Sequence, residues 1–186
     1  MRLFSALLLI ACFTVHAEGL PEQERIEGFH TNLIDMMDKA SQLEREAFIQ
    51  ANIEQLFDFE RIARVSLGRS WRELEKEAQD AFKDLLRQTV IATYARRFSE
   101  NRGQTFAVHG SKAVKKGVVV ESSVTPPDAE TVELDYFFSD GKVFNVAADG
   151  VSDLSLRRAD YNSVLKSEGF DALIAHLEQQ LRELRE

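Results

Sequence analysis

The 186-residue chain has few of the residues that build cross-links and reactive centres. It contains 1 cysteine, 3 prolines and 1 tryptophan, and 31 acidic residues outnumber its 23 basic ones. Because an internal disulfide needs two cysteines, the fold has to be stable without one, and a cysteine-based metal site is excluded. The net charge of −8 argues against a nucleic-acid partner, since phosphates would repel such a surface.

Motifs of covalent chemistry are also missing. The sequence has no nucleophile elbow, glycine-rich phosphate loop, dinucleotide fingerprint or paired-histidine zinc motif. Beyond the N-terminal segment the histidines are His30, His109 and His176, which lie on different predicted elements and are expected at surface or half-buried positions. Asp58 precedes a helix and is expected to cap it. We therefore expect a protein that is not an enzyme, with no catalytic residue, no cofactor and no metal.

The N-terminus has the pattern of an export signal. Arg2 is followed by an apolar run over residues 3–15, and the run closes with Val15-His16-Ala17, a pattern that signal peptidase recognises. The run is too short for a permanent membrane span. Residues 1–17 are therefore predicted to be a cleaved signal peptide, residues 18–186 a single domain, and the location the periplasm. An alternative is a lipoprotein signal in which Cys12 is lipidated.

Helical periodicity dominates both ends of the remaining chain. Residues 21–55 are predicted to form two amphipathic helices, the second with Ala47, Phe48, Ala51 and Leu56 on its buried stripe. Further helices are predicted from Asp58 to Gly68, over 75–100 with Gly103 as the stop, over 154–166 and over 170–185. Gly68 and Trp71 are expected to fix the turn between the third and fourth helices.

The middle of the chain has the period of two that marks β-strands. The predicted strands are residues 105–109, 113–125, 131–139 and 142–148, with Asp140-Gly141 as a two-residue hairpin turn. Alternation places Tyr136 and its apolar neighbours on one face and Glu133 and Asp135 on the other. Strands flanked by helices predict an α+β fold with helices packed over one sheet face.

Phenylalanine is the abundant aromatic residue, with 13 copies against 3 tyrosines. Its ring has no polar group that needs a partner, so most copies are expected to fill the core. A large dry cavity would also use such rings. Composition alone leaves both interpretations open.

Several segments in a fixed order resemble one known family. They are residues 57–64 (FDFERIAR), 67–72 (LGRSWR), 93–95 (TYA), 143–146 (VFNV), 149–152 (DGVS), 157–161 (RRADY) and 169–174 (GFDALI), with Gln79 and Phe82 between them. Together they resemble the MlaC family of periplasmic phospholipid-binding proteins, also called toluene-tolerance auxiliary proteins. Two departures, at 143–146 and in the entry at 149–156, are closer to the hopanoid-associated HpnM branch.

This resemblance implies a mixed, largely antiparallel sheet of four to five strands, wrapped by about six helices around an apolar lipid cavity, distantly similar to the cone-shaped NTF2-like fold. It implies a carrier that shuttles phospholipid, or a hopanoid or other hydrophobic molecule, and maintains outer-membrane lipid asymmetry. The implied partners are an inner-membrane ABC transporter complex with an MCE-type lipid-binding subunit and an outer-membrane lipoprotein complex.

On this interpretation the lipid-binding residues come from the long helix, the sheet and the segment after it. Each is equally compatible with a plain core position. Arg96 and Arg97 lie where a phosphate could be reached, although solvated helix charges are favoured. The predicted lining residues are Phe82, Leu85, Leu86, Thr89, Val132, Leu134, Tyr136, Phe138, Phe144, Val146 and Leu156.

Two other classes of protein compete with a lipid carrier. A small enzyme on a cone-shaped α+β scaffold would need a strongly perturbed Asp, His or Tyr in its cavity. A ligand-free accessory protein that only docks on membrane complexes would have a filled core.

The signal-peptide interpretation predicts processing next to Ala17, because the small-residue pattern there follows the whole apolar run. Intact-mass analysis of the exported protein should give an N-terminus at Glu18. A diacylated Cys12 at the N-terminus would contradict this expectation.

Overall fold

The computed structural model describes residues 21–186, so the predicted signal peptide and Cys12 lie outside the described residues. The chain runs through α1 Pro21–Met37, α2 Gln42–Leu56, α3 Phe59–Leu67, a short 3₁₀ helix η1 Ser70–Glu73 and α4 Lys76–Arg97. The strands follow as β1 Thr105–Val114, β2 Gly117–Thr125, β3 Val132–Ser139, β4 Lys142–Ala148 and β5 Val151–Ser152, before α5 Asp153–Ser167 and α6 Phe170–Arg185.

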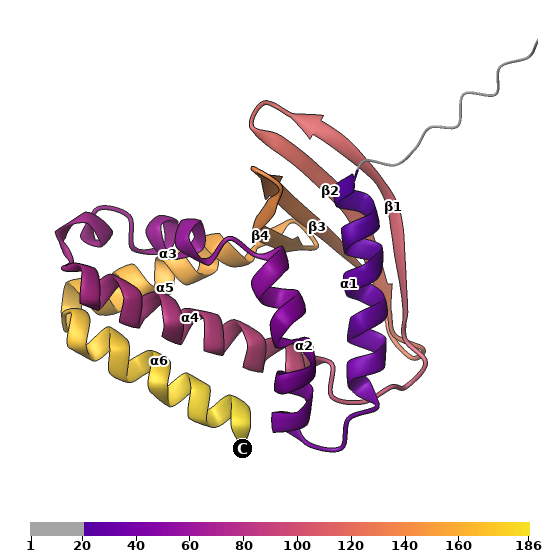
Figure 1. Ribbon diagram of the computed structural model, residues 1–186, viewed down its shortest axis with the longest axis horizontal. Coiled ribbons are helices and arrows are strands. Elements are labelled where there is room, and N and C mark those ends of the chain that lie inside the picture. Colours follow the sequence, from indigo (N-terminus) through magenta and orange to yellow (C-terminus); the bar gives the residue numbers. More distant parts are fainter. Residues whose placement is uncertain (1–20) are drawn as a thin grey trace, which may run out of the picture.

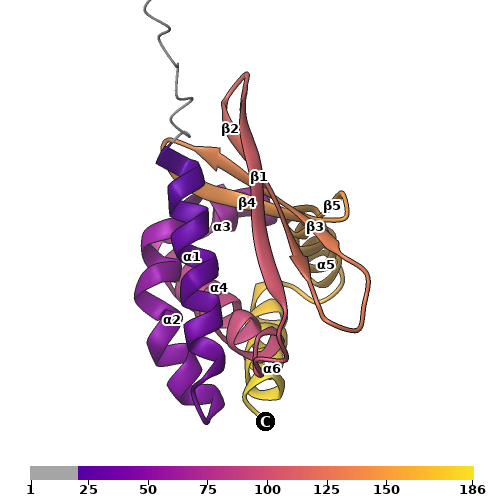
Figure 2. The same ribbon diagram turned by 90° about the vertical axis from the view of Figure 1, so that its right-hand side faces the viewer.

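The five strands form one sheet in sequence order, and each neighbouring pair is antiparallel. One isolated parallel bridge joins Phe57 to Val143 and ties the end of α2 to β4. Figure 1 shows α1 lying along β1 and β2, while α3 to α6 gather toward the other end of the sheet. Figure 2 shows α1 and α2 on one side of the long β1–β2 hairpin. The structure confirms the predicted α+β class.

Local capping explains where several helices begin and end. The Ser41 side chain accepts from the backbone N–H of Glu44, whose side chain reaches back, so α2 starts with a capping box. The Asp58 carboxylate accepts from the Arg61 N–H at 2.9 Å and starts α3, as predicted. Glu75 gives α4 no side-chain cap. This helix ends at Arg97, three residues before the predicted end, because the backbone turns at Phe98.

The buried face of α2 differs from the prediction. Ala47 and Ala51 are exposed, whereas Ile49 and Ile53 are fully buried. An isoleucine side chain removes more apolar area from water than an alanine, so the helix turns that stripe inward. The Arg45 guanidinium faces the same way and donates to the Ala95 carbonyl at 2.8 Å.

The predicted strand over 113–125 is wrong, because the chain reverses inside it. Strand β1 continues past His109 through a register shift between Val108 and Gly110, and the hairpin turns at Lys115 and Lys116. Gly117 makes this turn possible: its φ is +146°, and a Cβ atom there would lie 1.8 Å from the Phe138 carbonyl oxygen.

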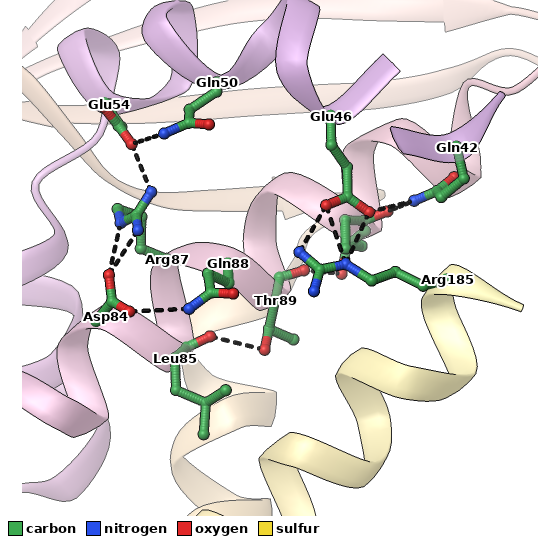
Figure 3. A network of polar contacts seen from close by, with 12 residues as sticks. Gln42, Glu46, Gln50, Glu54, Asp84, Leu85, Arg87, Gln88, Thr89 and Arg185 are labelled. Carbon is green, nitrogen blue, oxygen red and sulfur yellow. Dashed lines mark hydrogen bonds and ion pairs between the residues drawn. The ribbon is translucent and has the colours of Figure 1, made fainter. Parts of the chain in front are cut away.

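Polar contacts fasten α2 to α4 and α6 on the side away from the sheet (Figure 3). The Arg185 guanidinium forms an ion pair with the buried Glu46 carboxylate, with an Nη2–Oε2 distance of 2.7 Å. Arg87 donates to both Glu54 and Asp84. These pairs hold the helices together as one layer, so that only the remaining side of α4 faces the sheet.

Substitution of Gly117 by alanine should destabilise the fold by several kcal/mol, since backbone atoms of β3 would have to move. The matched control is Gly28→Ala in α1, where a Cβ meets nothing within 4 Å. Alanine there should be neutral or stabilise by up to about 1 kcal/mol. Urea unfolding followed by circular dichroism measures both variants. Equal stability of the two would contradict the close approach.

Candidate functional site

A cavity of about 200 Å³ lies between the sheet and the helices. Strands β3 and β4 form one wall, the C-terminal half of α4 forms the opposite wall, and the start of α5 closes one side. The end of α2 and the first half of α3 complete it. The lining residues are Phe57, Ile62, Val90, Thr93, Tyr94, Arg97, Phe98, Leu134, Tyr136, Phe144, Asn145, Val146, Ala148, Val151, Asp153, Leu154, Leu156 and Arg157.

The floor of the cavity is aromatic, and the Phe29 ring packs against it from the side away from the cavity. Tyr136 is 1% exposed, and the Phe29 ring meets it edge-on with centroids 6.4 Å apart. The Phe29 ring also packs against Phe57 and Tyr94, at 6.1 and 5.4 Å. Edge-to-face ring pairs of this kind form a stiff wall, since each pair stabilises the packing beyond the apolar area it buries.

His30 lies behind this wall and holds the Tyr136 hydroxyl. Its Nε2 atom is 3.2 Å from that oxygen, and its ring stacks on Phe106 at 4.6 Å. The prediction of a surface or half-buried histidine is wrong, because His30 is 4% exposed. Burial lowers the pKa of His30 to about 4, so the imidazole is neutral at neutral pH.

Tyr94 brings a phenol hydroxyl to the cavity from the helix side. The Tyr136 hydroxyl hydrogen-bonds His30, and the Tyr161 hydroxyl accepts from Arg157. Among residues 21–186, the Tyr94 hydroxyl has no hydrogen-bond partner, and Tyr94 lines the cavity. Burial raises the pKa of Tyr94 and of Tyr136 above the ordinary tyrosine value. Both phenols therefore stay protonated, and Tyr94 has a hydrogen-bond donor available to an occupant.

Asn145 fixes the start of α5 against the sheet. Its side-chain oxygen accepts from the Ser152 hydroxyl at 2.9 Å and from the Leu154 N–H at 3.1 Å. Ser152 in turn caps α5 by accepting from the Ser155 N–H at 3.1 Å. This junction positions Leu154 and Leu156 at the cavity.

The mouth of the cavity combines charge with exposed apolar side chains. Arg97 is exposed at the end of α4, and Arg157 is paired with Asp153 at 2.6 Å. Val151 and Leu156 are 53% and 59% exposed at the same opening. The cavity is thus apolar inside and carries fixed charges at its rim.

The structure brings together the sheet half of the predicted site. Five of the predicted residues line the cavity, and four of them lie on β3 and β4. These five are Leu134, Tyr136, Phe144, Val146 and Leu156.

The predicted residues of the long helix lie elsewhere. Phe82 and Leu86 are fully buried in the helix layer, where Phe82 packs against Trp71, Tyr161 and Phe170. Leu85 and Thr89 also lie outside the cavity. Helix α6 covers this part of α4, so its apolar stripe is used for helix packing. On β3, Val132 and Phe138 lie outside the lining as well.

The helix side of the cavity comes instead from Val90, Thr93, Tyr94 and Phe98, which the sequence analysis did not select. Thr93 and Tyr94 belong to the TYA segment of the family resemblance, so that segment could have pointed to this side of the cavity. Arg97 reaches the mouth, as considered for a phosphate contact, while Arg96 is exposed outside the lining.

The described part of the chain, residues 21–186, holds no group of three or more His, Cys, Asp or Glu side chains placed for a metal ion. Over the same residues, no helix combines the length and the apolarity that crossing a membrane requires. Among residues 21–186, the only carboxylate that lines the cavity is that of Asp153, and it is paired with Arg157. The arrangement suits holding an apolar molecule with a polar end at the mouth.

Fold and cavity together define an α+β protein with a site for an apolar ligand. The family model described as MlaC protein matches residues 29–179, and the chain belongs to this family. No curated protein sequence matches the chain. The fold is similar to a solved structure described as the phospholipid-binding protein from Ralstonia solanacearum in complex with a phospholipid, with a TM-score of 0.76 and 22% identity. The match covers 89% of this chain and 99% of that one.

The buried imidazole predicts a pH dependence of stability. His30 stays neutral in the fold down to about pH 4, whereas an unfolded histidine takes up a proton below about pH 6.5. The stability that comes from keeping His30 neutral is therefore fully present above pH 6.5, and it is lost as the pH falls toward 4. Between pH 7 and pH 5 the free energy of unfolding should fall by about 2 kcal/mol because of this residue.

The reference for this measurement is His30→Gln, which keeps a hydrogen-bond partner for Tyr136 and does not titrate. Urea unfolding at both pH values should show the additional loss in the wild type and not in the variant. The same slope in both proteins would mean that His30 is not the group responsible.

Proposed function

We propose that this protein is a lipid carrier that binds acyl chains of a phospholipid in the cavity and leaves the headgroup at the charged mouth. The observation that carries the proposal is the apolar cavity that ends at Arg97 and the Asp153–Arg157 pair. Membership of the MlaC family and the likeness to a phospholipid-binding structure support it. The proposal includes a periplasmic location and exchange with inner- and outer-membrane complexes.

Physical chemistry explains why such a carrier is needed. Exposing two acyl chains with about 28 methylene groups to water costs on the order of 20 kcal/mol, at about 0.8 kcal/mol per methylene. Unaided transfer across an aqueous compartment is then negligible. Moving the chains from a bilayer into an apolar cavity exchanges one dry medium for another, so loading and release can both occur without chemistry.

The described cavity is too small for two full chains. An engineered cavity of about 150 Å³ holds a benzene molecule, and pockets for larger ligands occupy about 300–1,000 Å³. At about 200 Å³ the cavity accommodates part of one chain. Loading therefore requires the walls to move apart, and the weakest side is the mouth, where Val151 and Leu156 already contact solvent.

A hopanoid or another hydrophobic molecule is the second candidate ligand. The segment 143–146 differs from the pattern that the resemblance implies for the family, and three of its residues, Phe144, Asn145 and Val146, line the cavity. Rigid rings would pack well against the aromatic floor. Extraction of the purified protein with organic solvent, followed by mass spectrometry, identifies the bound molecule.

A charge on the cavity wall should remove lipid and spare the fold. Val146 pairs with Tyr136 and is only partly buried, so Val146→Glu places a carboxylate where chains would lie yet leaves it access to water in the empty cavity. Co-purified lipid should fall at least about tenfold if the unpaired charge costs more than about 1.4 kcal/mol in the loaded state.

The matched control is Val114→Glu, the same change at a position that is 45% exposed near the β1–β2 turn. It should keep wild-type lipid content. Wild-type lipid content in Val146→Glu, with a normal melting temperature, would refute the cavity as the binding site. Phe82→Glu should instead prevent folding, because it buries a carboxylate in the helix layer.

Loading should also protect the walls from hydrogen exchange. A ligand that binds the folded state stabilises it, and apolar walls without an occupant lose contacts. On reloading delipidated protein, protection should rise in the second half of α4 and in β3, with little change in the first turns of α4 around Phe82, which lies outside the cavity lining. Identical exchange in both forms, with lipid binding verified separately, would mean that the cavity is rigid and preformed.

A further inference from the structure

An open groove on the outer side of α3, η1 and α5 is lined by arginine. The lining residues are Arg64, Gly68, Arg69, Arg72 and Arg158, and all four arginines are exposed. A neighbouring hollow shares Arg158 and adds Lys166. Neither lining contains a carboxylate. We call these four arginines the arginine groove, and it stands out in a chain whose net charge is −8.

The guanidinium groups of the groove have no partner in the part of the chain that the structure describes. None of the four takes part in an ion pair between residues 21 and 186. Three carboxylates on α3 and α5 are paired elsewhere: Glu60 with Lys83 at 3.1 Å, Asp153 with Arg157 at 2.6 Å and Asp160 with His176 at 3.3 Å. Glu73 of η1 is exposed and does not line the groove.

A purely structural role explains only part of the cluster. A cation in the last turn of α3 interacts favourably with the helix dipole, and Arg64 is placed for that. The same helix end is already satisfied, since Asn162 donates to the Ser66 carbonyl at 3.0 Å and Gly68 donates to the Arg64 carbonyl. Further guanidinium groups around one groove repel each other and lower stability. An anionic ligand would offset that repulsion.

We propose that the arginine groove docks an acidic segment of a protein partner. Guanidinium groups bind carboxylates through two parallel N–H···O bonds, so several arginines side by side fit a run of Asp and Glu side chains. Gly68 lies at the floor of the groove, where the Arg158 guanidinium is within van der Waals reach of a Cβ atom added to its backbone. The acidic remainder of the chain repels an acidic partner and thereby favours approach at the groove.

The position of the groove favours a protein partner over a bilayer surface. Leu156 at the cavity mouth and Arg158 in the groove are two residues apart on α5, so their side chains point about 200° apart around the helix. A flat membrane in front of the mouth would not reach the groove. The groove is also concave, which suits a chain segment better than a flat surface.

The test uses the purified folded protein and a fluorescein-labelled peptide of eight glutamates, followed by fluorescence anisotropy. The variant is Arg64→Gln/Arg69→Gln/Arg72→Gln. The control, Lys115→Gln/Lys116→Gln/Arg182→Gln, removes the same charge from exposed positions on the β1–β2 turn and α6. The groove variant should bind about tenfold or more weakly, as expected for three lost exposed ion pairs, while the control stays within about twofold of wild type.

Two further readouts separate docking from structure and from lipid binding. Wild-type affinity should fall as salt rises, because exposed charges are screened. The groove variant should melt at or above the wild-type temperature at low salt and keep its lipid content, which makes the result independent of the proposed lipid-carrier function. Arg158→Gln provides a second, single-residue variant with the same expected direction.

The proposal is overturned if the groove variants bind the peptide as tightly as wild type, or if the control loses as much affinity as the groove variant. It is also overturned if wild-type protein ignores the peptide but sediments with vesicles of equal parts phosphatidylglycerol and phosphatidylcholine, and the groove variants do not. In that case the groove would recognise a membrane surface.

Discussion

The apolar face of the sheet is the constraint from which the rest of the structure follows. Strands β2 to β4 direct Val120, Tyr136 and Val146 to one side, and that face has to be covered. Helix α1 covers the β1–β2 end, whereas α4 and α5 lie over β3 and β4. Because the sheet is twisted and the helices are straight, α1 at one end of the sheet diverges from α4 and α5 at the other. The cavity lies where they separate, with Tyr136 beneath it.

Buried polar groups hold the two sides of this opening in place. The His30 ring bonds the Tyr136 hydroxyl from the α1 side, and the Asn145 side chain bonds the first turn of α5 from the β4 side. The His30–Tyr136 bond is buried and the Asn145 bond is partly buried, so loss of one partner leaves a costly unsatisfied group, most of all at Tyr136. The back of the cavity and the start of α5 are therefore well defined. At the mouth lie the exposed side chains of Val151 and Leu156, Arg97 and the Asp153–Arg157 ion pair.

The sequence allowed the sheet half of the site to be predicted but not the helix half. Alternation along β3 identified the face that carries Leu134 and Tyr136, because a strand has only two faces. Helical spacing marked Phe82 as buried, which is correct, but it does not say which neighbour covers each turn. Helix α6 packs along α4 from Phe82, where Phe170 contacts it, whereas Val90, Thr93 and Tyr94 of α4 face the cavity. Phe57 and Asp153 line the cavity from junctions between elements, where no periodicity exists to reveal them.

The cavity and the arginine groove share one short helix. Helix α3 has 9 residues, too few for stability on its own, and depends on Asn162 of α5 and on the turn that Trp71 anchors against Phe82. Ile62 of α3 lines the cavity, and Arg64, two residues later, lines the groove. A movement of α3 therefore changes both sites together. If an acidic partner prefers one position of α3, it alters the affinity of the cavity for its occupant, and the occupant alters the affinity for the partner by the same factor. Under the proposed carrier function such a link would let the protein retain its ligand in water and release it where the acidic partner binds.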